Sequence, residues 1–163
     1  MPEYLVPVAS PALLDARPGL ALPEGLRDAT FLHDAVPWDG APAFVEWREW
    51  VEGALPREVQ RVLGTAYQSG HQYNLSQLAL RAAGSGQGVA IGRSALVLED
   101  ILAGRLRAPY GLPARSSAGY YTTHDVPLGE TGRTFLAWLR AQCREFILLR
   151  GEWLAGRDEA APP

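Results

Sequence analysis

The stretch "LSQLALRAAGSGQGVAIG", from Leu75 to Gly92, places a helix before a glycine-rich turn and a short strand after it. Leu75, Leu78, Ala79 and Ala82 recur with the 3.6-residue period of one helix face. The small apolar run that follows the glycines is typical of a buried strand. This order predicts a helix–turn–strand unit of an α/β fold.

Three alternating glycines, Gly84, Gly86 and Gly88, give this turn the look of a phosphate-binding loop. A dinucleotide fingerprint requires the order strand, glycine loop, helix, so that the helix N-terminus faces the pyrophosphate. The order here is reversed, and glycine just past a helix is the usual C-terminal cap. We therefore expect the glycines to be structural, with no nucleotide bound there.

The rest of the chain continues the alternation of short apolar strands with longer amphipathic helices. Strands are predicted at residues 4–10, 29–34, 61–70, 88–93, 106–111 and 119–125, and helices at 43–55, 73–83, 94–105 and 131–153, the last with a break near Gly151. Residues 156–163 are expected to be disordered. The pattern predicts one α/β domain with a largely parallel sheet.

The composition excludes several classes of site. All fifteen basic residues are arginine, so a Walker phosphate loop and a Schiff-base lysine are absent from this sequence. Cys143 is the single cysteine, which excludes an intrachain disulfide and a cysteine-based zinc cluster. We expect no cofactor and no metal. The net charge of −3, with arginines and acids interspersed, gives no reason to expect DNA binding.

The sequence also carries no targeting signal that we recognise. The first ten residues lack the basic region and long apolar core of a secretory signal. No apolar run approaches the roughly 20 residues of a membrane span. A cytoplasmic location without membrane association is expected.

No catalytic constellation stands out. Glu46, Glu49 and Glu52 are predicted to lie on the solvated face of their helix. The three histidines are widely spaced, and "GRSAL" around Ser94 lacks the second glycine of a nucleophile elbow. Ser94 is better interpreted as a helix N-cap, so we predict that the chain is not an enzyme.

The run "LALRAAGSGQGVAIGRSALVLEDILAGRLRAPYG", residues 78–111, resembles the effector-binding domain of LysR-type transcriptional regulators, in the branch of the glycine-cleavage activator and the β-lactamase regulator. "YLVPVASPALL", "FLHD" and "GYYTTHD…TFLAWLRAQ" match further segments of that family in order. The resemblance covers residues 4–146. It implies a type II periplasmic-binding-protein-like fold of two α/β lobes with a small effector in the cleft.

By this resemblance, residues 1–155 form a partial effector domain. Residues 4–104 would be mainly the second lobe, and residues 105–155 the returning strand and C-terminal helix. The winged helix-turn-helix and the first half of lobe one would precede Tyr4 and are not in this sequence, so direct DNA binding is not implied. The C-terminal helix, whose apolar residues include Phe135 and Trp138, is expected to fold back on lobe two or to pair with another copy.

The resemblance also implies a ligand site. Asn74 and Ser76, at a helix start, and Tyr120 on the returning strand would line the effector pocket, with Thr122 beside them and Ser10 and Pro11 in the crossover turn. A helix N-terminus favours a polar or anionic ligand in open α/β folds. The alternative is that Asn74 and Ser76 only cap the helix and Tyr120 only fills the core.

Three functional hypotheses remain at this point. The first is a non-catalytic domain that binds a small polar or anionic effector. The second is an interaction module that forms a homodimer or associates with an intact LysR-type regulator. The third is a small enzyme of unknown type.

Overall fold

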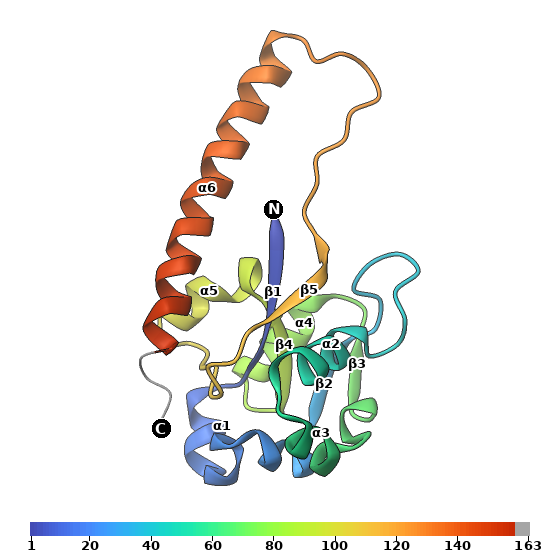
Figure 1. The fold of residues 1–163 in the computed structure, drawn as a ribbon, viewed down its shortest axis with the longest axis vertical. Helices are drawn as coiled ribbons and strands as arrows, with labels where there is room; N and C mark the ends of the chain where they lie inside the picture. Colours follow the sequence, from blue (N-terminus) through green and yellow to red (C-terminus); the bar gives the residue numbers. More distant parts are fainter. Residues whose placement is uncertain (159–163) are drawn as a thin grey trace.

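The computed structural model describes residues 1–158, which form one five-stranded mixed sheet flanked by helices, with a long helix beside it (Figure 1). The strands are β1 (Pro2–Val8), β2 (Phe31–Asp34), β3 (His71–Tyr73), β4 (Val89–Arg93) and β5 (Ala114–Gly119). The helices are α1 (Pro11–Ala16), α2 (Val45–Ala54), α3 (Arg57–Leu63), α4 (Ser76–Gly84), α5 (Ser94–Leu102) and α6 (Glu130–Asp158), with 3₁₀ turns η1 (Pro18–Ala21), η2 (Pro23–Asp28) and η3 (Ala66–Gln68).

The α/β class is confirmed, whereas the prediction of a largely parallel sheet is wrong. The strand order is β3-β2-β4-β1-β5, in which β2 is parallel to β3 and β4, and β1 is antiparallel to β4 and β5. Alternating strands and helices do not fix the direction of β1 and β5, because neither is joined to its sheet neighbour by a single helical crossover.

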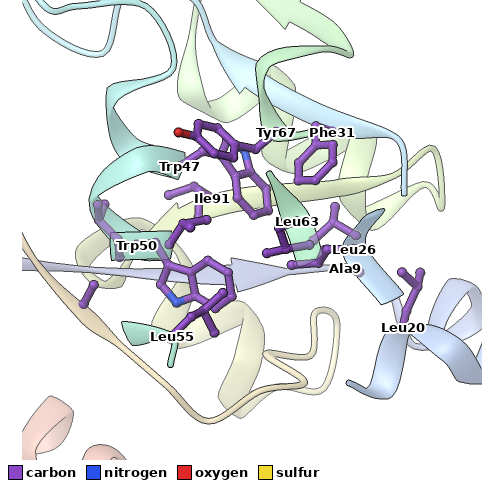
Figure 2. Close-up of a cluster of buried hydrophobic side chains, with 14 residues drawn as sticks. Ala9, Leu20, Leu26, Phe31, Trp47, Trp50, Leu55, Leu63, Tyr67 and Ile91 are labelled. Atoms are coloured by element: carbon purple, nitrogen blue, oxygen red, sulfur yellow. The ribbon is translucent and has the colours of Figure 1, made fainter. Parts of the chain in front are cut away.

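Apolar side chains bury both faces of this sheet. On one face a cluster around Trp47 and Trp50 of α2 packs against Phe31 and Ile91, as Figure 2 shows. The other face carries a second cluster, in which Ala79, Leu80, Ala82 and Ala83 of α4 and Val97 of α5 pack against Val6, Val8, Leu32 and Ala90 of the strands. Two helical layers around one sheet are the expected way to bury both of its faces.

The glycine turn takes the structural role predicted for it. Gly84 is the last residue of α4, and Gly86 has a positive φ of 79°. A Cβ at Gly88 would lie 2.2 Å from the carbonyl oxygen of Thr30, so only glycine lets β4 start beside β2. The chain's own geometry accounts for these glycines.

Three predicted strands are wrong. Residues 61–70 form the end of α3 and the turn η3, and the strand follows at His71–Tyr73. Residues 106–111 make only an isolated bridge between Arg107 and Ala9. The last strand is β5, which ends at Gly119, where the predicted strand begins. Glu49 of α2 accepts hydrogen bonds from Ser116 and Ser117 and supports this segment, which has no apolar alternation.

Helix α6 is continuous through Gly151 and reaches Asp158, so the predicted break is wrong and the predicted disordered tail begins inside the helix. A single glycine inside a helix costs only about 1 kcal/mol. Residues 159–163 lie outside the described part of the chain. Figure 1 shows that the C-terminal part of α6 lies beside the body, whereas its N-terminal part extends beyond the sheet, where Phe135 and Trp138 are 58% and 55% exposed.

Candidate functional site

One edge of the sheet gathers most of the buried charge in the described residues. The carboxyl ends of the parallel strands β2, β3 and β4 meet there, together with the N-termini of α4 and α5. Because β1 is antiparallel to β4, the start of β1 reaches the same edge, and the end of β5 follows it. We call this end of the sheet the carboxyl edge.

Arg93, the last residue of β4, lies at the centre of the carboxyl edge. Its Nε donates to Glu46 Oε1 at 2.7 Å and its Nη2 donates to the carbonyl oxygen of Pro37 at 2.9 Å. Nη2 also lies 3.6 Å from Asp34 Oδ2. Arg93 therefore ties α2, the end of β2 and the following loop to the end of β4.

The solvated face predicted for Glu46 is wrong, because this side chain is buried against Arg93. Burial raises the pKa of Glu46, and the Arg93 guanidinium opposes that change. Burial alone would lower the pKa of Arg93, but the Glu46 carboxylate, together with Tyr120 and Asp34, outweighs burial, so the pKa of Arg93 is raised. The 2.7 Å contact makes the pair a partly buried salt bridge.

Asn74 and Ser76 lie at the start of α4 as predicted, but neither is its N-cap. Leu75, not Asn74, is the N-cap residue, and it has no side-chain acceptor for the N–H groups of the first turn. The Ser76 hydroxyl donates to Asp34 Oδ2, and the Asn74 side chain is exposed. Ser76 and Arg93 both contact Asp34. The N–H groups in the first turn of α4 have no side-chain cap and are available to a ligand.

Tyr120 lies at the same edge, 39% exposed, between Glu3 and Arg93. Burial raises the pKa of Tyr120 to about 12, the Glu3 carboxylate adds to this and Arg93 opposes it. The backbone of Tyr120 exchanges hydrogen bonds with Met1, which extends the pairing of β5 with β1. The predicted residues Ser76 and Tyr120 therefore flank the same arginine.

A second buried group joins the carboxyl edge to α6. Arg150 is 3% exposed and donates from Nη1 to the Pro2 carbonyl oxygen at 2.9 Å and to Ser94 Oγ at 3.1 Å. Ser94 Oγ donates to the buried Glu3 carboxylate, which also accepts from the Ala95 N–H. Glu3 therefore caps α5, and the prediction that Ser94 is the N-cap is wrong, because Ser94 is already the first helical residue.

The remaining predicted residues lie elsewhere. Ser10 accepts a hydrogen bond from the Leu13 N–H and caps α1, with Pro11 as the first residue of that helix. The Ser10 N–H donates to Ala83 at the far end of α4, so Ser10 and Pro11 lie at the opposite edge of the sheet from Ser76. Thr122 lines a groove between α6 and the segment that returns from β5.

Other chemistry-bearing residues do not form a recognisable centre. His33 is buried, its Nε2 donates to the Ser69 carbonyl oxygen at 2.8 Å, and burial lowers its pKa. Within residues 1–158, no three His, Cys, Asp or Glu side chains are grouped so as to hold a metal ion. No helix in that part of the chain is both long and apolar enough to cross a membrane.

Comparison with known proteins gives a consistent result. The family model described as LysR substrate binding domain matches residues 1–144. The chain is 34% identical over 146 residues to the glycine cleavage system transcriptional activator of Escherichia coli strain K12, and 29% identical over 147 residues to the HTH-type transcriptional regulator DsdC of the same strain. These alignments cover 86% and 88% of this chain, but 42% and 45% of the relatives, so the chain spans less than half their length.

Solved structures share the fold at lower identity. The effector domain of the transcriptional regulator AmpR of Pseudomonas aeruginosa superposes with a TM-score of 0.64 at 20% identity, over 92% of this chain and 64% of that one. The regulatory domain of AphB from Vibrio vulnificus, treated with cumene hydroperoxide, gives a TM-score of 0.51 at 17% identity, over 86% of this chain and 65% of that one. The prediction of a type II periplasmic-binding-protein-like fold is confirmed by this similarity.

Proposed function

The chain belongs to the LysR substrate-binding domain family, and from this premise we propose that it binds a small polar or anionic effector at its carboxyl edge. The observation that carries the proposal is the convergence of Ser76, Arg93 and Tyr120 at one end of the sheet. In open α/β sheets, ligands bind beyond the carboxyl ends of the strands.

Each group at this edge has a role that follows from its chemistry. The N–H groups in the first turn of α4 favour a carboxylate or another anion. Beside them the Asn74 amide can donate to a ligand, and the Ser76 hydroxyl, which itself donates to Asp34, can accept from a ligand N–H. Tyr120 closes the site from the returning segment, and Thr122 follows it in the groove beside α6. Arg93 keeps its partners Glu46 and Asp34, so it acts by positioning this edge.

Ser10 and Pro11 take no direct part in this site. They start α1, and Ser10 lies beside the C-terminal end of α4, whereas Ser76 lies at its N-terminal end. The domain division inferred from the resemblance, with residues 4–104 as the second lobe and 105–155 as the returning strand and C-terminal helix, is part of the same proposal.

The proposed role is non-catalytic. The one buried serine at the edge, Ser94, donates to Glu3 and accepts from Arg150, so no histidine is placed to activate it. We also place the chain in the cytoplasm, where a regulator would meet a metabolite.

An interaction module remains the second candidate, because α6 exposes Phe135, Trp138 and Leu148. Large exposed apolar residues on one element favour a protein contact. A homodimer or association with an intact LysR-type regulator would cover them. A mass that rises with concentration in light scattering would support this candidate, and a constant monomer mass would refute self-association.

Glycine is the first probe, because one relative is named for the glycine cleavage system. We would titrate the chain by calorimetry with glycine, other small amino acids and dicarboxylates. At least one should bind, and Ser76→Ala should weaken it by about tenfold, the loss of one hydrogen bond near a charged group. Ser85→Ala, at the other end of α4, is the matched control and should bind as the original chain does. Equal weakening by both variants, or no binding by any compound, would refute the proposal.

A further inference from the structure

A small cavity lies between the end of β2 and the start of α2. Its volume is about 10 Å³, which is the space that a single water molecule needs. His33 of β2 and Trp47 of α2 both line it, and these side chains are 4% and 2% exposed. Figure 2 shows the Trp47 indole inside the buried cluster, where its ring packs edge-on against Phe31. We call this space the His33 cavity.

Two buried polar atoms of the residues that line the His33 cavity lack a hydrogen-bond partner. They are Nδ1 of His33 and Nε1 of Trp47, and neither is paired with any group in residues 1–158. Leaving such atoms buried and unpaired costs free energy, so native proteins pair nearly all of them with protein groups or ordered water. Trp50, one turn further along α2, follows this rule, because its Nε1 donates to the Leu112 carbonyl oxygen at 2.6 Å.

The two unpaired atoms have opposite hydrogen-bonding roles. His33 Nε2 lies 2.8 Å from the Ser69 carbonyl oxygen, which can only accept, so Nε2 carries the ring proton. Burial lowers the pKa of His33, which favours the neutral ring and leaves Nδ1 as an acceptor. Trp47 Nε1 can only donate. A single partner for both atoms must therefore accept one hydrogen bond and donate another.

A carboxylate that lines the same cavity offers a third contact. Asp34 and Glu46 both line it. Both oxygens of Asp34 already accept, Oδ1 from the Val36 N–H and Oδ2 from the Ser76 hydroxyl. Glu46 accepts from Arg93 through Oε1 alone, as far as the described residues show, so its other oxygen can accept from an occupant of the cavity.

The chemistry of the lining excludes a charged occupant. A metal cation would suit the carboxylates but cannot accept from the Trp47 N–H. An anion could accept from Trp47 but would meet the Asp34 and Glu46 carboxylates, and it has no hydrogen to donate to His33. A neutral molecule that both donates and accepts, and that is no larger than the cavity, satisfies every group.

From these roles we propose that the His33 cavity binds one water molecule, which accepts from Trp47 Nε1 and donates to His33 Nδ1 and to the Glu46 carboxylate. Three hydrogen bonds are typical of a buried water. This water joins β2 to α2 and holds Glu46, which in turn holds Arg93 at 2.7 Å. Its role is to position the carboxyl edge, and it does not depend on whether that edge binds the proposed effector.

The experiment is a water-selective NMR measurement on the isotope-labelled full chain with no ligand added. The Trp47 indole N–H should show a rotating-frame cross-peak to water that is opposite in sign to the diagonal. Direct contact with a bound water produces this sign, whereas proton exchange does not. Trp50 is the matched control on the same helix, and its indole N–H should show no such cross-peak, because a carbonyl oxygen is its partner.

The ring state of His33 and two variants test the partners of this water. A long-range proton–nitrogen spectrum should show His33 protonated on Nε2 alone. His33→Phe removes the acceptor and fills the cavity with a larger ring, so the Trp47 cross-peak should disappear. Tyr67→Phe removes a hydroxyl of the same cluster that could relay exchange from water, and it should keep the cross-peak. Circular dichroism and an unchanged Trp50 indole shift would show that each variant is folded.

Three results would overturn the proposal. The first is a folded chain in which Trp47 shows no more contact with water than Trp50 does. The second is a His33 ring protonated on Nδ1, which would remove the acceptor. The third is loss of the cross-peak in Tyr67→Phe or its survival in His33→Phe. The cross-peak should persist in Ser76→Ala, the variant that weakens effector binding, so either proposal can fail without the other.

Discussion

Replacing Arg150 with methionine would test whether a buried guanidinium holds α6 on the rest of the domain. Arg150 donates to the Pro2 carbonyl oxygen at 2.9 Å and to Ser94 Oγ at 3.1 Å, and its charge lies 3.8 Å from Glu3 Oε1. The guanidinium carbon also lies 4.7 Å from the centre of the Tyr4 ring. Methionine keeps much of the length and apolar contact of arginine but removes the charge and all the donors.

Removing one partner of a buried ion pair costs about 3–5 kcal/mol, because the other charge is left uncompensated. The lower end, about 3 kcal/mol, applies here, since Glu3 keeps hydrogen bonds from the backbone N–H groups of Tyr4 and Ala95. Adding Glu3→Gln to the variant removes the orphaned charge. The double variant should recover at least about 1 kcal/mol of the loss.

Urea unfolding followed by circular dichroism measures the free-energy change, and hydrogen exchange shows whether α6 opens alone. In Arg150→Met the amides in the C-terminal half of α6 should exchange faster than those of β4. Arg140→Met, an exposed arginine on the same helix, should stay within about 0.5 kcal/mol of the original chain. A loss below about 1 kcal/mol for Arg150→Met, or equal effects of the two variants, would refute the reasoning.

Three further predictions follow from single contacts. Burial lowers the pKa of His33 from 6.5, so below that pH the unfolded chain binds a proton that the folded chain resists. The free energy of unfolding should therefore fall as pH drops below 6.5, by up to about 1.4 kcal/mol per pH unit. In urea unfolding, His33→Phe should lose this pH dependence and His71→Gln should keep it. Gly88→Ala should lower the free energy of unfolding by about 3 kcal/mol, because the added Cβ would overlap the carbonyl oxygen of Thr30. Gly19→Ala has open space around it and should stay within about 0.5 kcal/mol of the original chain in thermal unfolding. Glu49→Ala should release β5, seen as faster amide exchange over Ala114–Gly119 with β4 unchanged.

Local signals explain which parts of the fold could be predicted. The helix, glycine turn and strand around Gly86 depend on neighbours in sequence, so periodicity and cap chemistry identify them. Strand β5 has no apolar alternation and is held by Glu49, which is 67 or 68 residues away in sequence. Residues 61–70 have β-branched and aromatic members, but packing on η2 and the other elements makes them helical.

The candidate site was harder to predict, because its charges pair over long separations. Arg93 and Glu46 are 47 residues apart, and Arg150 and Pro2 are 148 residues apart. Tyr120 is implied only by the resemblance, whereas Ser76 is also indicated by its place at a predicted helix start. A buried arginine on an otherwise apolar helix face, as at Arg150, is the one signal that could have indicated the link between α6 and β1.

The most direct test of effector binding at the carboxyl edge is an amide chemical-shift map of the chain with the best compound from the glycine, amino-acid and dicarboxylate panel. We expect the largest shifts at Asn74 to Leu78, at Arg93 and at Tyr120, with α1 unaffected. Shifts centred elsewhere, or no shifts at any of these amides with every compound, would contradict the account.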